Sequence, residues 1–412
     1  MELSDLTPPL PKKTNRLPRE FWIVTFIAFV NAICFTIIIP LLYPYAKEFN
    51  LSDFQASLLT TSFAICQFVG TPILGKLSDR YGRKPLLVLS LAGTVVANII
   101  ASFTPFAWLL FLARMFDGLT GGNVSIARAV ISDVTTAEER PQAFGIFGAT
   151  FRLGFVVGPT LSYFSQKIPT FAGISSLGMS FLVAATIAVV VTLLTLFFLP
   201  ETLPASQRDS FDLNPRDFAL DKIFRALTYP KIGQLLILTF LSGSTFTIFT
   251  FAFQPFLLFV LDREADTLAM VFVLVGILGF VTQVFALQPL RKRFDLVEIL
   301  SVTIALRGVA FLLIPLFPNV TAFFVIMAAF GVVNSFPLPI TNALISLNTS
   351  DRQQGEILGI NASYLSISNA VGPPVSGLLV SFGYGTPFWV TGILTLLTAV
   401  FAYRLKWQLA RE

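Results

Sequence analysis

Twelve long apolar segments constrain this chain more than any other feature of its sequence. Each has roughly 20 residues or more, enough for a helix to cross the ~30 Å hydrocarbon core of a bilayer. The segments lie at 21–44, 54–75, 85–103, 106–131, 142–165, 176–198, 233–260, 267–289, 297–315, 319–345, 356–380 and 385–405. Charged residues make up only 12% of the 412 residues, about half of the share in a soluble chain. We therefore predict an all-α polytopic membrane protein with twelve transmembrane helices.

The basic residues predict how these segments are oriented. If the N-terminus is cytoplasmic, 21 of the 28 lysines and arginines fall in cytoplasmic segments, and three (Lys47, Lys167 and Arg263) fall outside. The other four lie within the apolar segments. This excess is the positive-inside signal, so both ends are expected in the cytoplasm of a multi-pass protein of the cell (inner) membrane. The net charge of +5 reflects this topology, and no nucleic-acid partner is expected.

The apolar segments fall into two groups of six, separated by the longest polar stretch, 201–231. We refer to the two groups as the first half and the second half. The predicted parts are a cytoplasmic N-terminal tail (1–20), the first six-helix half (21–198), a cytoplasmic linker (199–232), the second six-helix half (233–405) and a cytoplasmic C-terminal tail (406–412).

The two halves repeat each other in sequence. FGIFGATFRLGFVVGPTLS at 144–162 aligns with LGINASYLSISNAVGPPVS at 358–376, an offset of 214, and GKLSDRYGRK at 75–84 aligns with QPLRKRFDLV at 288–297, an offset of 213. Two stretches at nearly one offset indicate a duplication. Duplicated, pseudo-symmetric halves are typical of transporters, which place the substrate site between the halves near the bilayer midplane.

Residue types that the chain lacks limit its chemistry. It has no histidine and only two cysteines, Cys34 and Cys66, which lie inside apolar segments and are expected to be buried thiols. We predict no metal site, no cofactor and no enzymatic activity, because no nucleophile–base set is present. Any proton that the protein handles must be carried by a carboxylate.

The loop after the second apolar segment carries a specific motif, Gly75-Lys-Leu-Ser-Asp79-Arg80-Tyr-Gly82-Arg83-Lys84. A basic turn is expected in any cytoplasmic loop, but the lone aspartate and the spaced glycines are not explained by charge alone. The stretch resembles the loop signature G-x-L-[SA]-D-R-x-G-R-[RK] of the major facilitator superfamily. The resemblance implies a cytoplasmic gate loop that latches the two halves together, with Asp79 facing the start of segment 356–380 near Glu356 and Arg83 reaching Asp133.

The fourth segment contains Arg114-Met-Phe-Asp117-Gly118-Leu-Thr-Gly-Gly-Asn. It resembles the R-x-x-D-G-x-T-G-G-N stretch of the tetracycline-resistance branch of drug:proton antiporters. Residues three apart on a helix can form an ion pair, and Arg128, about four turns after Arg114, is expected on the same face of one continuous helix. The pair is either structural or functional. Ionisable groups inside a membrane are typical of transport sites, so Asp117, with Arg114, is our candidate for proton coupling.

The fifth segment carries a second motif of the exporters, Gly145-x8-Gly154-x3-Gly158-Pro159-x2-Ser162. It resembles the antiporter signature G-x8-G-x3-G-P-x2-G-G, although Ser162 and a tyrosine stand where the family has two glycines. Small residues let helices pack closely. We expect Gly158 to pack this antiporter helix against the opposite half of the protein.

Two further arginines lie inside apolar segments, Arg152 in the fifth and Arg307 in the ninth. One interpretation pairs them with Asp117, or with carbonyls and polar groups such as Asn361 and Asn369. The other makes them, with Arg128 and Asn361, part of a cationic substrate path for an acidic or amphipathic anion. Both interpretations stay open at the level of the sequence.

The leading functional hypothesis is a secondary active transporter that exports a small, partly apolar, drug-like compound in exchange for a proton by alternating access. The expected partners are that compound, the proton and the lipid bilayer, and we expect a monomer. A carrier of a specific anionic metabolite or lipid precursor on the same fold is the first alternative. A membrane receptor or chaperone that no longer transports is the second.

Overall fold

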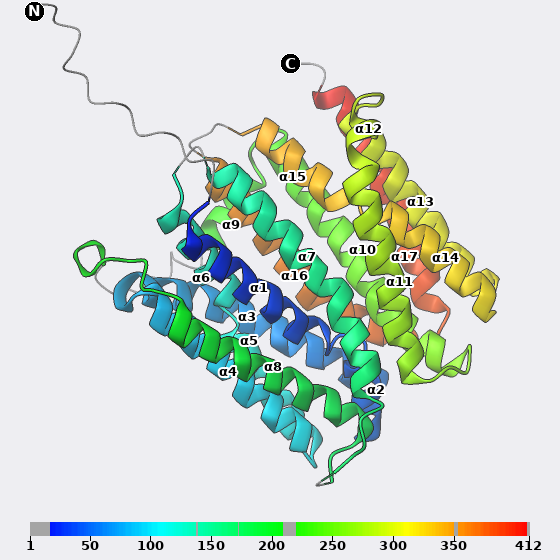
Figure 1. Ribbon diagram of the computed structural model, residues 1–412. Coiled ribbons are helices and arrows are strands. Elements are labelled where there is room, and N and C mark those ends of the chain that lie inside the picture. Colours follow the sequence, from blue (N-terminus) through cyan, green and yellow to red (C-terminus); the bar gives the residue numbers. More distant parts are fainter. Residues whose placement is uncertain (1–16, 137–138, 172, 209–219, 350–352, 410–412) are drawn as a thin grey trace, which may run out of the picture.

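The computed structural model describes residues 17–136, 139–171, 173–208, 220–349 and 353–409, and all regular elements among them are helices (Figure 1). The start of the predicted N-terminal tail, the middle of the linker and the last residues of the C-terminal tail lie outside the described residues. The two halves lie side by side, with the first half in blue to green and the second half in yellow-green to red.

The helices of the first half follow the apolar segments closely. They are α1 (Arg19–Thr36), α2 (Leu42–Glu48), α3 (Asp53–Tyr81), α4 (Arg83–Phe103), α5 (Ala107–Thr120), α6 (Asn123–Val134), α7 (Arg140–Ser165) and α8 (Ser176–Phe198). A short 3₁₀ turn, η1 (Ala205–Gln207), follows. The remaining helices are α9 (Leu220–Ala226), α10 (Ile232–Phe259), α11 (Ala265–Phe285), α12 (Leu287–Arg291), α13 (Leu296–Leu316), α14 (Val320–Val333), α15 (Pro337–Leu347), α16 (Gln354–Val380) and α17 (Thr386–Leu409).

Nine helical stretches among the described residues are long and apolar enough to cross a membrane. They are α1, α3, α4, α8, α10, α11, α13, α14 with α15 (Val320–Leu347), and α17 as far as Lys406. The segments predicted at 106–131, 142–165 and 356–380 are helical but are not among these nine. Large apolar side chains on the outside of the bundle, such as Phe197 at 73% exposed, are suited to contact with lipid tails rather than water.

Three of the predicted continuous segments are interrupted, so the expectation of one uniform helix in each is wrong. The first turns at 37–41, around Pro40, because proline lacks the N–H that an interior helical residue donates. The fourth breaks between α5 and α6 at Gly121 and Gly122, since glycine is the poorest helix former after proline. The tenth breaks at 334–336, and Pro337 then begins α15, a position where proline is favoured.

The duplication seen in the sequence is repeated in the packing. Thr36 of α1 donates its hydroxyl to the Gly154 carbonyl of α7 at 2.8 Å. In the second half Thr247 of α10 donates to the Ser368 carbonyl of α16 at 2.9 Å, and Ser368 stands at offset 214 from Gly154. The two halves therefore use the same threonine-to-backbone contact to join the corresponding helices.

Candidate functional site: a buried ion pair, a polar network and an unpaired arginine

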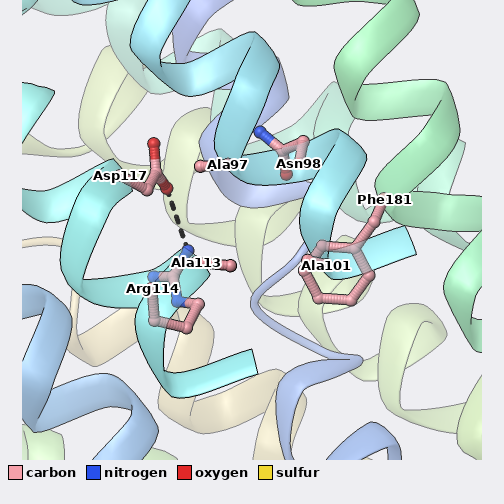
Figure 2. A pocket seen from close by; sticks show the side chains of 7 residues that line it. All are labelled: Ala97, Asn98, Ala101, Ala113, Arg114, Asp117 and Phe181. Carbon is pink, nitrogen blue, oxygen red and sulfur yellow. Dashed lines mark hydrogen bonds and ion pairs between the residues drawn. The ribbon is translucent and has the colours of Figure 1, made fainter. Parts of the chain in front are cut away.

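The ion pair expected in the fourth segment is present and buried. Arg114 Nη1 lies 3.0 Å from Asp117 Oδ2, and the two side chains are 6% and 9% exposed. They border a small recess lined by residues of α4, α5 and α8, as Figure 2 shows. The pair thus lies inside the first half, away from bulk solvent, where the loss of one charge would leave the other unpaired at high cost.

Neighbouring helices fix the position of both charges. The Arg114 guanidinium lies over the Phe63 ring of α3, 4.3 Å from its centroid, and the Thr94 hydroxyl of α4 lies near the Asp117 carboxylate. Gly118 brings α5 close to α3, because a side chain at this position would collide with the Phe63 backbone and would lie 3.0 Å from Cys66 Cβ. The glycine that follows Asp117 in the motif is therefore a packing residue.

The expectation that Arg128 shares a face with Arg114 is wrong. Arg114 is 5% exposed, whereas Arg128 is exposed. The break at Gly121 and Gly122 ends the helical repeat between them, so counting turns across it does not place the second arginine.

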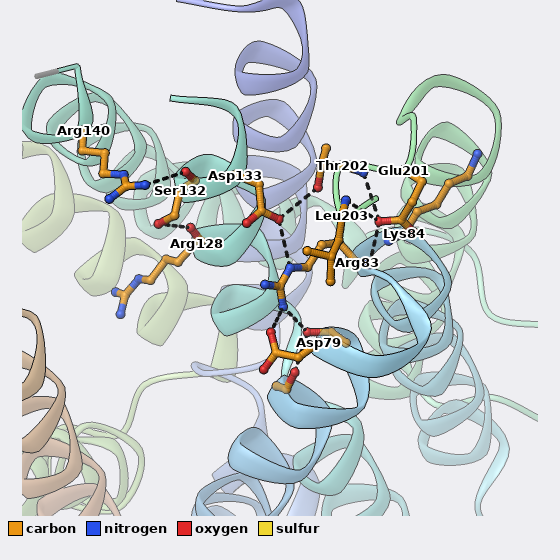
Figure 3. Close-up of polar contacts among 12 residues, drawn as sticks. Asp79, Arg83, Lys84, Arg128, Ser132, Asp133, Arg140, Glu201, Thr202 and Leu203 are labelled. Carbon is orange, nitrogen blue, oxygen red and sulfur yellow. Dashed lines mark hydrogen bonds and ion pairs between the residues drawn. The ribbon is translucent and has the colours of Figure 1, made fainter. Parts of the chain in front are cut away.

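A network of polar contacts gathers at the cytoplasmic gate loop (Figure 3). Arg83 is its centre. Its Nε donates to Asp133 Oδ2 at 3.0 Å, and its Nη1 donates to Asp79 Oδ1 at 2.5 Å and to Ser78 Oγ at 2.8 Å. Arg83 therefore reaches Asp133, the partner expected for it.

Other members of the motif have local roles. Asp79 binds Arg83 of its own half and is 41% exposed, while the side chain of Glu356, its expected neighbour, lies outside the described residues. The Arg80 guanidinium lies 5.1 Å from the Tyr81 ring centroid. An added Cβ at Gly75 would lie 3.8 Å from Ser125 Oγ of α6, so this glycine allows α3 and α6 to approach.

Glu201 is a member of the network that the sequence did not reveal. Its carboxylate accepts hydrogen bonds from the backbone N–H groups of Arg83 at 2.9 Å and Lys84 at 3.3 Å, at the start of α4. It also accepts from the N–H groups of Thr202 and Leu203. Gly82, with φ of +105°, makes the turn that brings these groups together. A carboxylate at a helix N-terminus satisfies donors that have no partner inside the helix.

The antiporter helix, α7, packs differently from the expectation. A Cβ at Gly158 would collide with Thr36 Oγ1 and lie 2.8 Å from Thr36 Cβ, and one at Gly154 would lie 3.1 Å from the Ala32 carbonyl carbon. Both glycines thus face α1 of the same half. The prediction that Gly158 packs against the opposite half is therefore wrong. Pro159 lies inside the helix, and Gly145 has no atom of another element within 4 Å of the position a Cβ would take.

At the end of the bundle opposite the gate loop, a set of contacts joins the two halves. We call Tyr43, Lys47, Asp53, Phe259 and Tyr384 the outer cluster. Asp53 Oδ1 accepts from Tyr43 and Lys47, each at 2.5 Å. The Tyr43 ring lies edge-on to Phe259, and Phe259 stacks on Tyr384 at 5.5 Å.

A close backbone approach accompanies the outer cluster. A Cβ at Gly377 of α16 would lie 2.9 Å from Phe54 Cα and 3.0 Å from the Asp53 carbonyl oxygen of α3. Two turns further along α3, Thr61 donates to the Ala370 carbonyl at 2.9 Å. The two halves are thus in direct contact at this end.

A groove of about 470 Å³ lies beside this contact, between the α7–α8 connection and the start of α11. Its charged residues are Lys167 from the first half and Glu264 and Asp266 from the second. The hydrogen bond that Lys167 donates to the Tyr163 hydroxyl raises the pKa of the lysine, and the nearby Asp266 carboxylate adds to this.

Arg307 of α13 is buried, at 2% exposed, and it contacts a carbonyl and neutral polar side chains, as the first interpretation expected. Its Nη2 donates to Ser242 Oγ at 2.9 Å, to the Ser242 carbonyl at 3.1 Å and to Thr245 Oγ1 at 3.3 Å, and its Nη1 donates to Asn334 Oδ1 at 3.3 Å. These acceptors come from α10 and the end of α14, and the residues named as possible partners, Asp117, Asn361 and Asn369, are not among them.

The other two residues of the predicted substrate path are Asn361 and Arg152. Asn361 Nδ2 donates to Asn342 Oδ1 of α15 at 2.8 Å, and the side-chain oxygen of Asn361, Oδ1, has no hydrogen-bond partner. The side chain of Arg152 lies outside the described residues.

Comparison with known proteins places this chain in a family of transporters. The sequence model of the Major Facilitator Superfamily matches residues 24–286 and 235–412. The chain is similar to the class B tetracycline resistance protein of Escherichia coli, with 27% identity over 376 residues that cover 89% of each chain. It is also similar to multidrug resistance protein 2 of Bacillus subtilis (strain 168), with 24% identity and coverage of 94% of this chain and 95% of the relative.

Solved structures share the fold at lower identity. The human organic anion transporter MFSD10 (TETRAN) has a TM-score of 0.69 and 21% identity, and the match covers 93% of this chain and all of that one. A bacterial homologue of the human lysosomal transporter Spinster, in an inward-facing and unoccupied conformation, has a TM-score of 0.74 and 15% identity over 94% and 96% of the two chains. All of these proteins are transporters or resistance proteins.

Proposed function

Because the chain belongs to the major facilitator superfamily, we propose that it is a secondary active transporter that exports a small, partly apolar compound in exchange for a proton. In this proposal all twelve apolar segments cross the cell membrane, both ends are cytoplasmic, and the protein works as a monomer. The names of its relatives, tetracycline and multidrug resistance proteins, favour a drug-like compound.

Contacts at the two ends of the bundle support alternating access. At one end the outer cluster and Gly377 bring the halves into contact. Towards the other end, Gly145 and Gly148 on α7 and Gly359 on α16 have no atom of another element within 4 Å of a Cβ position. These helices are therefore unobstructed near the cytoplasmic gate loop. This asymmetry is typical of a conformation open to the cytoplasm, from which a compound would be loaded.

The buried pair of Asp117 and Arg114 carries the proposal of proton coupling. A carboxylate inside a membrane protein is costly and is usually retained for ion or substrate movement. Protonation of Asp117 would neutralise the acid and release Arg114, whose remaining contact is the Phe63 ring. The neighbouring helices α3, α4 and α8 would then repack around the pair, which couples the proton to the conformation of the first half.

The test is Asp117→Asn in proteoliposomes with an imposed pH gradient. Asparagine keeps an oxygen that can accept from Arg114 but cannot exchange a proton. We expect uphill transport to be lost, while exchange of labelled compound without a gradient continues. Tetracycline and a panel of acidic, neutral and cationic compounds serve as probes. Asp262→Asn, an exposed carboxylate in the loop before α11, is the matched control.

Two results would contradict this assignment. If Asp117→Asn still concentrates a compound against its gradient, Asp117 is structural. If the unmodified protein shows neither exchange nor gradient-driven uptake with any compound of the panel, a receptor or chaperone that does not transport becomes the better description.

A further inference from the structure

We propose that Arg307 and the polar groups around it bind the carboxylate of the transported compound, so that the substrate class is that of partly apolar organic anions. This inference rests on the proposed transport function. It assigns a binding site to the second half, separate from the Asp117 pair of the first.

The first argument is the set of acceptors around the guanidinium. Arginine has five N–H donors, and the acceptors that Arg307 meets are all neutral: two oxygens of Ser242, the Thr245 hydroxyl and the Asn334 amide oxygen. Its Nε, which is buried, has no hydrogen-bond partner. The site thus holds an unused donor on a fully charged group.

The second argument is charge balance. The other arginine that is buried deep inside a half, Arg114, pairs with a carboxylate at 3.0 Å. No ion pair among the described residues includes Arg307. A buried charge without a counter-ion is strongly unfavourable, and a planar carboxylate matches the guanidinium fork in two parallel hydrogen bonds. An anionic substrate would supply the missing charge.

The third argument is access. Although Arg307 is only 2% exposed, its partners Ser242 and Asn334 are half-buried, so the cluster extends from the interior to an accessible surface. Ser244 lies on the same stretch of α10, and its buried hydroxyl has no partner. Asn334 stands at the break between α14 and α15.

The fourth argument is the apolar surface next to the charge. Phe246, partly buried, follows Thr245 and stacks on Phe330 with ring centroids 6.3 Å apart. Phe330 lies one helical turn before Asn334. A cation beside aromatic rings is suited to a compound that carries a carboxylate on an apolar body, rather than to a small inorganic anion.

The experiment measures binding to purified protein in detergent, without any gradient. The probes are 1-naphthoate and its neutral isostere 1-naphthamide, compared by isothermal calorimetry at constant chloride concentration. We expect the carboxylate to bind about tenfold to a hundredfold more tightly than the amide, the range for hydrogen bonds to a charged group. Arg307→Gln should abolish this preference. Arg404→Gln, an exposed arginine on α17, is the matched control and should retain it.

A second variant guards against misfolding of the first. Arg307→Lys keeps the charge but loses the fork, so it should bind the carboxylate more weakly than the unmodified protein and still prefer it to the amide. Equal binding of both probes to the unmodified protein would overturn the proposal. So would competition of chloride alone for the site, which would identify an inorganic anion site, or an unchanged preference in Arg307→Gln.

The two proposals fail in different ways. Loss of gradient-driven transport in Asp117→Asn concerns the proton and leaves naphthoate binding unchanged. Loss of the carboxylate preference in Arg307→Gln concerns the substrate and leaves the response to the pH gradient intact for neutral compounds.

Discussion

Gly158 offers a direct test of what the antiporter motif does in this chain. Its Cβ position lies 2.8 Å from Thr36 Cβ and 2.9 Å from the Ile37 nitrogen, and collides with Thr36 Oγ1. Even alanine must therefore push α7 away from α1 or rotate Thr36. Overpacking of this kind costs about 1–3 kcal/mol, and loss of the hydrogen bond from Thr36 to Gly154 adds roughly 1 kcal/mol. We expect Gly158→Ala to lower the free energy of unfolding by about 2–4 kcal/mol.

The second half supplies the matched control. A Cβ at Gly372 would collide with Thr247 Oγ1, and would lie 2.8 Å from Thr247 Cβ and 3.1 Å from the Ile248 nitrogen. Gly372→Ala should therefore destabilise the protein by the same amount within about 1 kcal/mol, since the packing terms are the same. If the motif acts through packing inside a half, the two variants should also transport equally well per folded molecule.

The assay combines unfolding in detergent with transport normalised to folded protein. The packing argument is refuted if Gly158→Ala is as stable as the unmodified protein. If the two variants are equally stable but only Gly158→Ala loses proton-driven transport, the motif has a role in coupling beyond packing.

Two further predictions concern the ends of the bundle. Asp53→Asn removes the charge that holds Lys47 and Tyr43 in the outer cluster. Because the ion pair is partly exposed, the substitution should weaken the contact between the halves at this end by about 1 kcal/mol. The ratio of closed to open molecules then falls roughly fivefold. A cysteine in place of Thr61, in a background without Cys34 and Cys66, should then react faster with an impermeant thiol reagent from outside, and an unchanged rate would argue against an outer gate. Glu201→Ala removes the carboxylate that accepts from the first N–H groups of α4, and it should lower the free energy of unfolding in detergent by about 1–2 kcal/mol. The comparison is Glu264→Ala, in the groove beside the outer cluster. An equal effect of the two substitutions would show that the contact of Glu201 with α4 is unimportant.

The positions of the helices could be predicted from the sequence because hydropathy depends on composition over about 20 residues. The buried pair of Arg114 and Asp117 could be predicted as well, since it depends only on the helical spacing of three. Both are local properties. They do not require knowledge of which helix packs against which.

Contacts between distant segments could not be predicted in the same way. The spacing of Gly154 and Gly158 indicates a close helix contact but not that the neighbour is α1 rather than a helix of the opposite half. Glu201 follows the sixth apolar segment and gives no signal of its role, because it reaches the start of α4 through the tertiary fold. The break at Gly121 and Gly122 interrupts the helical repeat, so the number of turns between Arg114 and Arg128 does not predict the face on which Arg128 lies.

The internal repeat shows how the two halves have diverged in charge. At the offset of 213, Arg114 and Asp117 correspond to Met327 and Phe330, and Thr94 corresponds to Arg307. The first half thus has a balanced ion pair with the neutral hydroxyl of Thr94 near it. The second half has an apolar cluster where that pair would stand.

In the second half, Arg307 stands at the position that corresponds to Thr94 of the first half. Phe330 packs on Phe249 and Phe311, while Arg307 has only neutral acceptors. In the proposed cycle the first half exchanges a proton on its paired carboxylate, and the second half pairs its cation with an anion loaded from the cytoplasm. If both sites act in one cycle, the charge that Arg307 lacks is provided when the substrate is bound, and the interface between the halves is where the two events become coupled.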